Sequence, residues 1–391
     1  MTIQLLVTND AMVVQGDPLV DWLDLDAIKN FNEPGSGSVT LPALPEVMAQ
    51  LQPGNRLTVI RDGAIWMTGP MEVPTDYSWS VDGDPGPGQV KVSFSDDLAT
   101  IAGYITWPEP ALTWAGQHGS TWRKFNAINS EAVIRALVNE NCGPGAIAAR
   151  RIPNLILDGV TGAGSSTTLN TRFEPVLEVC RRAALDGGGI GFRVRQDGTQ
   201  LKFGCYVPAD KTATARFSQG LGNLRSVSFR QSSPGLTHAL VAGNEIEDNT
   251  IRTYVEVPDP TAAAMWWRVE RFIDGGADND TNGELTAAGT AEVAEGAAPI
   301  ELSTVTVDTD DLKAGRDFDL GDKVAVALPH GLEVTDIVRS IHLQASPESG
   351  ESVATLVGSP DATTDPQMVQ LIRTLSRRLG RLETRGKSDV H

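Results

Sequence analysis

The sequence predicts a mainly β chain, α+β overall, built from two related β-barrel domains, an inserted α/β domain and a C-terminal coiled-coil helix. Three observations lead to this class. Strand-like runs of alternating apolar residues outnumber helical runs. Gly (39) and Pro (23) make up about a sixth of the 391 residues, as is usual in turn-rich β proteins. A heptad pattern occupies the last part of the chain, and the length favours two to four domains.

Residues 1–110 are predicted to form the first β-barrel domain. The runs 56–61 and 64–68 flank Asp62-Gly63, a pair that favours a tight hairpin turn. Further on, Val90, Val92 and Phe94 alternate with polar residues, the pattern of a strand with one wet face. The Gly/Pro-rich run 82–88 between these strands is predicted to be a loop.

Residues 111–217 are predicted to form the inserted α/β domain. Ser130 is expected to cap one helix, and Thr171-x-x-Glu174 has the form of a capping box for a second helix that ends at the glycines 187–189. The apolar faces of these helices are Val133, Ile134, Leu137 and Val138 in the first, and Val176, Leu177 and Cys180 in the second. A hairpin should follow, with strands at 192–195 and 200–206 around Asp197-Gly198.

Residues 218–365 are predicted to form the second β-barrel domain, with strands near 227–229, 253–257, 266–272 and 300–307. An acidic, alanine-rich insertion at about 274–298 carries a short helix, 284–295. Late in this region, Gly321-Asp-Lys-Val-Ala-Val326 parallels Gly54-Asn-Arg-Leu-Thr-Val59, and a second turn glycine follows each, Gly331 and Gly63. This internal similarity favours two copies of one barrel. Chance similarity of two common turns is the alternative.

Residues 366–391 are predicted to form a coiled-coil helix that Asp365 and Pro366 begin. The a and d positions of its seam are Met368, Ile372, Leu375, Leu379 and Leu382. In a parallel assembly, Arg378 at g and Glu383 at e are placed for a salt bridge between chains. Alternatively the helix packs on its own body with the help of Val369 and Leu371. The mixed a/d core is compatible with a coiled coil of two or three helices. Because Gly380 weakens the helix, the coiled coil must be one assembly contact among several.

The net charge of −18 is unevenly placed. Residues 368–387 hold six Lys/Arg and one Glu, so the rest of the chain stands at −23. This acidic part of the chain should repel nucleic acid, unless DNA only has to slide past it. No run approaches eighteen apolar residues, and the N-terminus has no secretion-signal pattern, so we expect a soluble chain without membrane insertion.

No motif for catalysis or for a cofactor stands out. The sequence contains no G-x-S-x-G, H-E-x-x-H, Walker A or G-x-G-x-x-G pattern. The string Asp278-Asn-Asp-Thr-Asn-Gly-Glu284 opens like a calcium loop, but its twelfth position is Gly289 rather than a carboxylate, so a weak cation site or a solvated turn remain open. Cys142, Cys180 and Cys205 lack metal-ligand spacing and are expected to be reduced core residues. We predict no catalytic, cofactor or metal residues and no enzymatic activity.

The order of features resembles the baseplate hub, or tail-associated minor tail protein, of long-tailed bacteriophages, in the form common among phages of actinobacteria. The resemblance rests on five stretches of sequence: 31–42, 53–70, the helix and hairpin 172–206, 267–274 with 283–286, and 320–324. It implies two tube-type β-barrels per chain and a homotrimer that joins a six-fold tail tube to a three-fold tip.

The same resemblance implies the surroundings of the chain. It would lie at the virion tail tip, with the distal tail protein and the tape measure protein above it and a tail fibre or tip protein below. Phage DNA would pass through its channel without specific binding. Two rival functions remain open: a tail-tip cell-wall hydrolase, and a carbohydrate-binding receptor protein that uses Trp107, Trp114 and Trp122, which core packing would otherwise explain.

Overall fold

The computed structural model describes residues 3–78, 88–118, 121–231, 233–243, 253–274, 282–296, 300–328 and 331–358. The chain divides into two compact units. One comprises Met1–Arg225 and Val305–Leu356, and the other comprises Ser226–Thr304 and Val357–His391. The architecture is mixed α+β and rich in strands, as the sequence predicts. The four-part division at 110, 217 and 365 stays a prediction.

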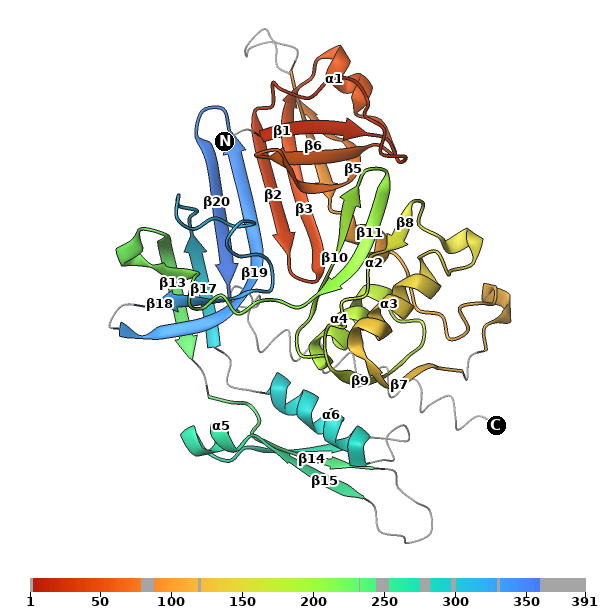
Figure 1. Cartoon of the computed structure of the whole chain (residues 1–391), viewed down its shortest axis with the longest axis vertical. Helices are drawn as coiled ribbons and strands as arrows, with labels where there is room; N and C mark the ends of the chain where they lie inside the picture. The colour runs from red at the N-terminus through yellow and green to blue at the C-terminus, as the bar shows by residue number, and fades with distance from the viewer. Residues whose placement is uncertain are drawn as a thin grey trace. The chain divides into compact units, whose positions relative to one another are not determined.

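Among the described residues, ten strands of the first unit form one large sheet (Figure 1). Nine of them follow the order β1-β4-β5-β6-β3-β2-β19-β18-β12, and β20 pairs with β19. The strands are β1 (Ile3–Thr8), β2 (Asp24–Asn30), β3 (Glu33–Pro42), β4 (Arg56–Arg61), β5 (Ala64–Ser78), β6 (Gln89–Ser95), β12 (Arg216–Ser218), β18 (Lys323–Ala327), β19 (Glu333–Ser346) and β20 (Gly350–Val357).

The long strand β19 joins the N-terminal strands to the C-terminal ones. Its first part, from Glu333 to Ile337, pairs with β18, and its second part, from Ser340 to Ala345, pairs with β2. The described strands therefore follow an open path, and they show no closed barrel in their pairing. This pairing does not show the two expected β-barrel domains, which stay a prediction, because the long strand β19 joins both strand groups in one sheet.

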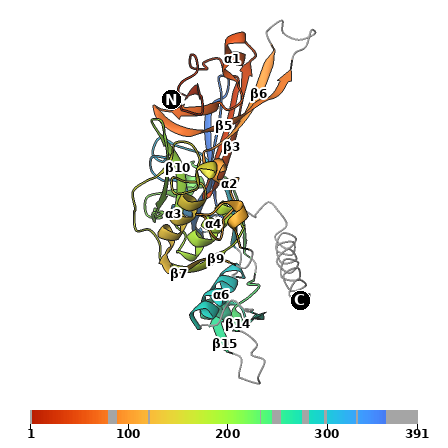
Figure 2. The ribbon, with the colours of Figure 1, turned by 90° about the vertical axis from the view of Figure 1, so that its right-hand side faces the viewer.

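The hairpin predicted at Asp62-Gly63 is confirmed by the pairing of β4 with β5. Asp62 (φ 51°) and Gly63 (φ 81°) both take the left-handed conformation that such a two-residue turn requires. Beyond this hairpin, β5 pairs with β6 (Figure 2). The strand β6 contains Val90, Val92 and Phe94, so the strand predicted there is confirmed.

The local geometry of the internal similarity also recurs. Gly54 and Gly321 both have φ 85°, and each leads into a strand, β4 or β18, whose alternate apolar side chains are buried. The later turn glycines Gly63 and Gly331 have φ 81° and 79°. The similar sequences at the two turns are therefore matched by similar φ angles of their glycines.

The middle of the first unit contains two helices packed beside two small sheets. The helices are α3 (Ser130–Asn141) and α4 (Val176–Asp186), and the sheets are β10-β11-β8 and β7-β9. Their strands are β7 (Arg123–Asn129), β8 (Leu155–Leu157), β9 (Ser166–Thr171), β10 (Gly191–Asp197) and β11 (Gln200–Tyr206). The predicted apolar faces of both helices are buried in one core, and the predicted hairpin 192–206 is confirmed.

Both predicted helix caps in this part need correction. Asn129, rather than Ser130, caps α3, because its side chain accepts a hydrogen bond from the backbone N–H of Ala132 at 3.3 Å. The helix α4 begins after Pro175 and has no side-chain cap. The Thr171 hydroxyl instead hydrogen-bonds with Thr106 at 2.8 Å, and Glu174 accepts from Arg182, so the expected capping box does not form.

In the second unit, the helix α6 (Asn282–Glu295) packs on a three-stranded sheet of order β15-β14-β16. The strands are β14 (His238–Ala242), β15 (Tyr254–Pro258) and β16 (Glu270–Asp274), and the core between helix and sheet contains Leu236, Ala239, Val241, Leu285 and Val293. The predicted helix 284–295 is confirmed. The predicted strand 266–272 is only half right, because the strand β16 starts at Glu270. Before it, Asp259 and Pro260 begin a short helix, α5 (Pro260–Met265), that was not predicted from the sequence.

The remaining elements are short. They are α1 (Pro45–Gln50), α2 (Leu98–Ala102), the 3₁₀ turns η1 (Trp114–Gly116), η2 (Ala148–Arg150) and η3 (Gln219–Leu221), and the paired strands β13 (Leu224–Gln231) and β17 (Ile300–Thr306). Within the described residues, no helix has the length and apolar character needed to cross a membrane.

Candidate functional site

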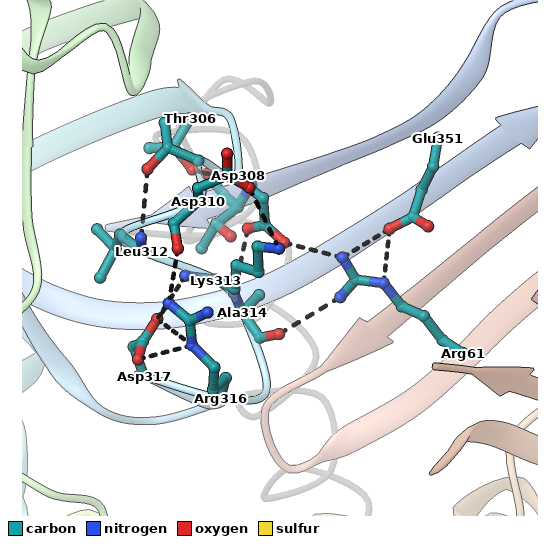
Figure 3. Close-up of polar contacts among 12 residues, drawn as sticks. Arg61, Thr306, Asp308, Asp310, Leu312, Lys313, Ala314, Arg316, Asp317 and Glu351 are labelled. Carbon is teal, nitrogen blue, oxygen red and sulfur yellow. Dashed lines mark hydrogen bonds and ion pairs between the residues drawn. The ribbon is translucent and has the colours of Figure 1, made fainter. Parts of the chain in front are cut away.

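A set of largely buried charges lies at the end of β4, around Arg61 (Figure 3). Its guanidinium donates from Nε to Glu351 Oε1 at 2.6 Å, from Nη2 to Asp308 Oδ2 at 3.1 Å and from Nη1 to the carbonyl of Ala314 at 3.4 Å. The side chains of Arg61, Asp308 and Glu351 are only 8%, 12% and 12% exposed. We call these three residues the Arg61 cluster. It fastens β4 to β20 and to the loop that follows β17.

The electrostatics of the cluster fit a structural role. Burial raises the pKa of Asp308, whereas the backbone N–H of Ala314 and the Arg61 guanidinium lower it. The Arg61 guanidinium contacts the carboxylates of both Asp308 and Glu351. Buried charged groups need an oppositely charged partner of this kind. Two carboxylates held by one arginine are poorly placed to exchange a proton or to bind a cation.

The other end of β4 is fastened in the same manner. Arg56 Nη2 lies 2.5 Å from Asp97 Oδ1, and both side chains are almost fully buried. Burial raises the pKa of Asp97, and the charge of Arg56 opposes that rise. The strand β4 therefore starts and ends in a buried ion pair.

Trp66 occupies a β-bulge beside the Arg61 cluster. Trp66 has no paired residue in the register of β4 with β5, so it is the extra residue of the bulge. A β-bulge changes the direction in which the extra side chain points. The ammonium of Lys29 lies 3.7 Å from the Trp66 ring centroid, and the guanidinium of Arg61 lies 5.2 Å from it. Burial lowers the pKa of Lys29, while the charge of Asp319 opposes that shift. The partly buried indole thus lies against two cations.

Separate contacts join the large sheet to the hairpin β10–β11. Asn32, at φ 56°, donates to the carbonyl of Ile190 at 2.9 Å and accepts from the N–H of Phe192 at 2.8 Å. Arg193 pairs with Asp319 at 3.0 Å, and the Tyr206 hydroxyl donates to the carbonyl of Leu320 at 3.1 Å. These contacts tie the middle of the unit to both strand groups of the sheet.

The described residues offer little for catalysis. They contain no group of three or more His, Cys, Asp or Glu side chains that could hold a metal ion. Cys142, Cys180 and Cys205 are buried free thiols, as expected, and burial raises the pKa of Cys142 and of Cys205 to about 12. Thiols with such pKa values are inert at neutral pH.

A loop at residues 108–118 exposes a tryptophan. Trp114 is 78% exposed, and Trp122, further on, is 37% exposed. The Gln117 amide closes the loop: its Nε2 donates to the carbonyl of Glu109 at 2.8 Å, and its Oε1 accepts from the Glu109 N–H at 3.0 Å. Core packing does not account for Trp114. By contrast, Trp107 is partly buried and stacks with Arg150, whose guanidinium lies 4.0 Å from the ring.

The residues predicted for the coiled coil lie outside the described part of the chain: Met368, Ile372, Leu375, Arg378, Leu379, Leu382 and Glu383. The opening of the calcium-like string, 278–281, also lies outside it. Sequence reasoning missed the Arg61 cluster. One signal was present, since alternation puts Arg61 on the same face of β4 as the buried Leu57 and Val59.

The fold is similar to that of several solved tail proteins. The chain is similar to the tail protein from Neisseria meningitidis MC58 (TM-score 0.57, 14% identity, 93% of this chain and 98% of that one). It is also similar to the 43 kDa tail protein of prophage MuSo2 from Shewanella oneidensis (TM-score 0.58, 14% identity, 92% and 99%). A third similar structure is the prophage tail protein gp18 from Listeria monocytogenes EGD-e (TM-score 0.51, 12% identity, 96% and 99%). The fold is therefore that of prophage tail proteins.

The family follows from the sequence itself. Residues 4–359 match the model of the Siphovirus ReqiPepy6 Gp37-like protein family, and the chain belongs to that family. No curated protein sequence matches the chain.

Proposed function

We propose that the chain is a structural protein of the phage tail tip, a trimeric baseplate hub that joins the six-fold tail tube to a three-fold tip. The observation that carries the proposal is the family match over residues 4–359 together with a tail-protein fold that extends over nearly the whole chain. In this role the chain is not an enzyme. The distal tail protein and the tape measure protein would lie above it, and a tail fibre or tip protein below.

Three features of the chain support a ring of this kind. The equivalent turns at Gly54 and Gly321 give one chain two similar strand entries, so three chains would present six. The C-terminal seam from Met368 to Leu382 would hold three copies together near the three-fold axis. The acidic body, at −23 outside residues 368–387, would let DNA pass through the channel without adhering to it.

Cryo-electron microscopy of the assembled tail tip tests the proposal. We expect a three-fold ring of this chain with an open axis and with the helices 366–391 bundled on or near it. A single copy on the outside of the tail would refute the hub. A chain truncated after Asp365, measured by light scattering beside the intact chain, then isolates the contribution of the C-terminal helix to trimer formation.

One observation favours a second function, a receptor protein that binds cell-surface carbohydrate. Trp114 is largely exposed on a loop held by its own hydrogen bonds, and an exposed indole is suited to stacking on the apolar face of a sugar. Binding of the purified chain to intact host cells, lost in Trp114→Ser but retained in Val207→Ser, would support this function. Val207 is a suitable control because it is also exposed, at 66%. For the cell-wall hydrolase, no arrangement among the described side chains provides support.

A further inference from the structure

We propose that an apolar groove near the N-terminus binds a basic amphipathic segment of a neighbouring tail protein. The groove lies between residues 15–21 and α1, has a volume of about 520 Å³, and is called the N-terminal groove below. Leu19, Leu41, Leu44 and Val47 are among its apolar lining residues. The proposal rests on the proposed function, because it names a partner surface of the same tail-tip protein.

The outer wall of the N-terminal groove is a well-fixed segment. The backbone N–H groups of Gln15 and Leu19 donate to the carbonyls of Val7 and Leu5, at 2.8 and 2.9 Å, so the segment runs along the free edge of β1. In Figure 1, α1 lies at the same end of the sheet as β1. Although its backbone is held, this segment leaves Val20 73% exposed. Apolar side chains displayed on a fixed segment are typical of a binding surface.

The wall of the groove also contains a buried amide. Gln50 is only 9% exposed and lines the groove, and its Nε2 donates to the carbonyl of Asp17 at 3.3 Å. Its Oε1 is buried and has no hydrogen-bond partner in the described structure. The amide is packed against Gly16, where a Cβ atom would lie 2.8 Å from Gln50 Cδ. A partner that donates a hydrogen bond to Oε1 would satisfy this buried atom.

The charges around the groove indicate which kind of partner it binds. Asp17, Asp21 and Glu46 line it and are exposed, and no Lys or Arg is among its lining residues. Acidic residues around an apolar floor complement a segment that carries Lys or Arg beside apolar side chains. The proposed partner is not the chain's own basic segment, 368–387, because the apolar seam of that segment is predicted to form the coiled coil.

Cross-linking in assembled tails tests the occupant. Val20 is replaced by the photo-reactive residue p-benzoylphenylalanine, which its exposure permits, and the cross-linked peptides are sequenced by mass spectrometry. We expect a cross-link to a Lys/Arg-rich segment with apolar residues in another tail protein. A cross-link to an acidic segment or to residues 366–391 of this chain, or none in tails that contain the chain, would overturn the inference. Tails that lack the chain would refute the proposed function itself.

A charge reversal then measures the electrostatic part. The cross-linked segment is synthesised as a peptide and titrated against the full chain. Glu46→Lys should weaken binding about tenfold or more, because like charges then meet. The matched control is Asp310→Lys, an exposed carboxylate that does not line the groove, and it should change binding by less than about twofold. Equal effects of the two variants would refute a charge-selected groove. Gln50→Leu should also weaken binding, because it removes the acceptor.

Discussion

Arg61 on β4 donates a 2.6 Å hydrogen bond to Glu351 on β20, a residue 290 positions later in the chain. The same guanidinium bonds Asp308, 247 positions away. These two contacts are made inside the unit, where water does not screen them. They tie the N-terminal and C-terminal strand groups of the large sheet into one structure, which the proposed hub needs if each chain is to act as a rigid segment of a ring.

Removal of the central arginine should be costly. Arg61→Met leaves two buried carboxylates without their counter-ion, and we expect it to lower the free energy of unfolding by about 3–5 kcal/mol in urea titrations. Arg216→Met, which breaks an exposed pair with Glu333, is the control and should cost less than about 1 kcal/mol. Adding Asp308→Asn and Glu351→Gln to Arg61→Met should recover part of the loss. A single variant as stable as the control would contradict a central role for the cluster.

The two equivalent glycines should respond differently to alanine. Gly54 and Gly321 share φ 85°, so alanine at either site is strained by about 1 kcal/mol or more. Only at Gly321 would the new Cβ meet a side chain, 2.3 Å from Phe31, whereas the space around Gly54 is open. We expect Gly321→Ala to lower the thermal midpoint clearly more than Gly54→Ala. Equal midpoints would mean that Phe31 moves aside without cost.

Asn32 should contribute through its side-chain hydrogen bonds rather than its backbone conformation. Asn32→Gly keeps the positive φ accessible but leaves the carbonyl of Ile190 and the N–H of Phe192 unpaired, which should cost about 1–3 kcal/mol. The control is Asn154→Gly, at φ 60° on the surface, and it should stay within about 0.5 kcal/mol of the wild type. Hydrogen exchange at the Phe192 amide reports the loss directly, and unchanged protection there would argue against the clamp.

Asp96 should make stability depend on pH. Burial raises its pKa from 3.8 to about 6, so between these values the folded chain binds more protons than the unfolded chain, and stability falls as pH rises. Above pH 6 the cost is complete, at up to about 3 kcal/mol. Asp96→Asn, which keeps an acceptor for the Leu98 N–H, should therefore gain stability over the wild type from pH 4 to pH 6.5 and hold that gain above it.

Urea titrations of both proteins at pH 4, 5, 6, 7 and 8 give this difference directly. Asp310→Asn serves as the control for removal of an exposed carboxylate and should show a flat difference across the series. A flat difference for Asp96→Asn as well would mean that the Asp96 carboxylate is solvated in the folded chain.

Local chemistry made much of the secondary structure predictable. Asp62-Gly63 specifies its hairpin turn through the conformations these residues accept, and the buried stripe of 133–138 specifies the face of α3. The caps were less predictable, because Thr171 and Glu174 found partners, Thr106 and Arg182, that compete with the expected capping box. The sequence predicted two β-barrel domains, whereas the described strands of both groups share one sheet through β19, whose neighbours are a property of the whole fold.

The sequence by itself determined the α+β class, the positions of most strands and helices, the uneven charge and the family. These follow from periodicity, turn residues and composition, which act over a few residues or over the whole chain at once. Only the tertiary structure decided that Arg61 contacts Asp308 and Glu351. It also decided that Gln50, with its buried amide oxygen, lines an apolar groove bordered by acidic residues. Contacts between residues hundreds of positions apart leave no periodic trace, because they depend on which strands become neighbours in the folded sheet.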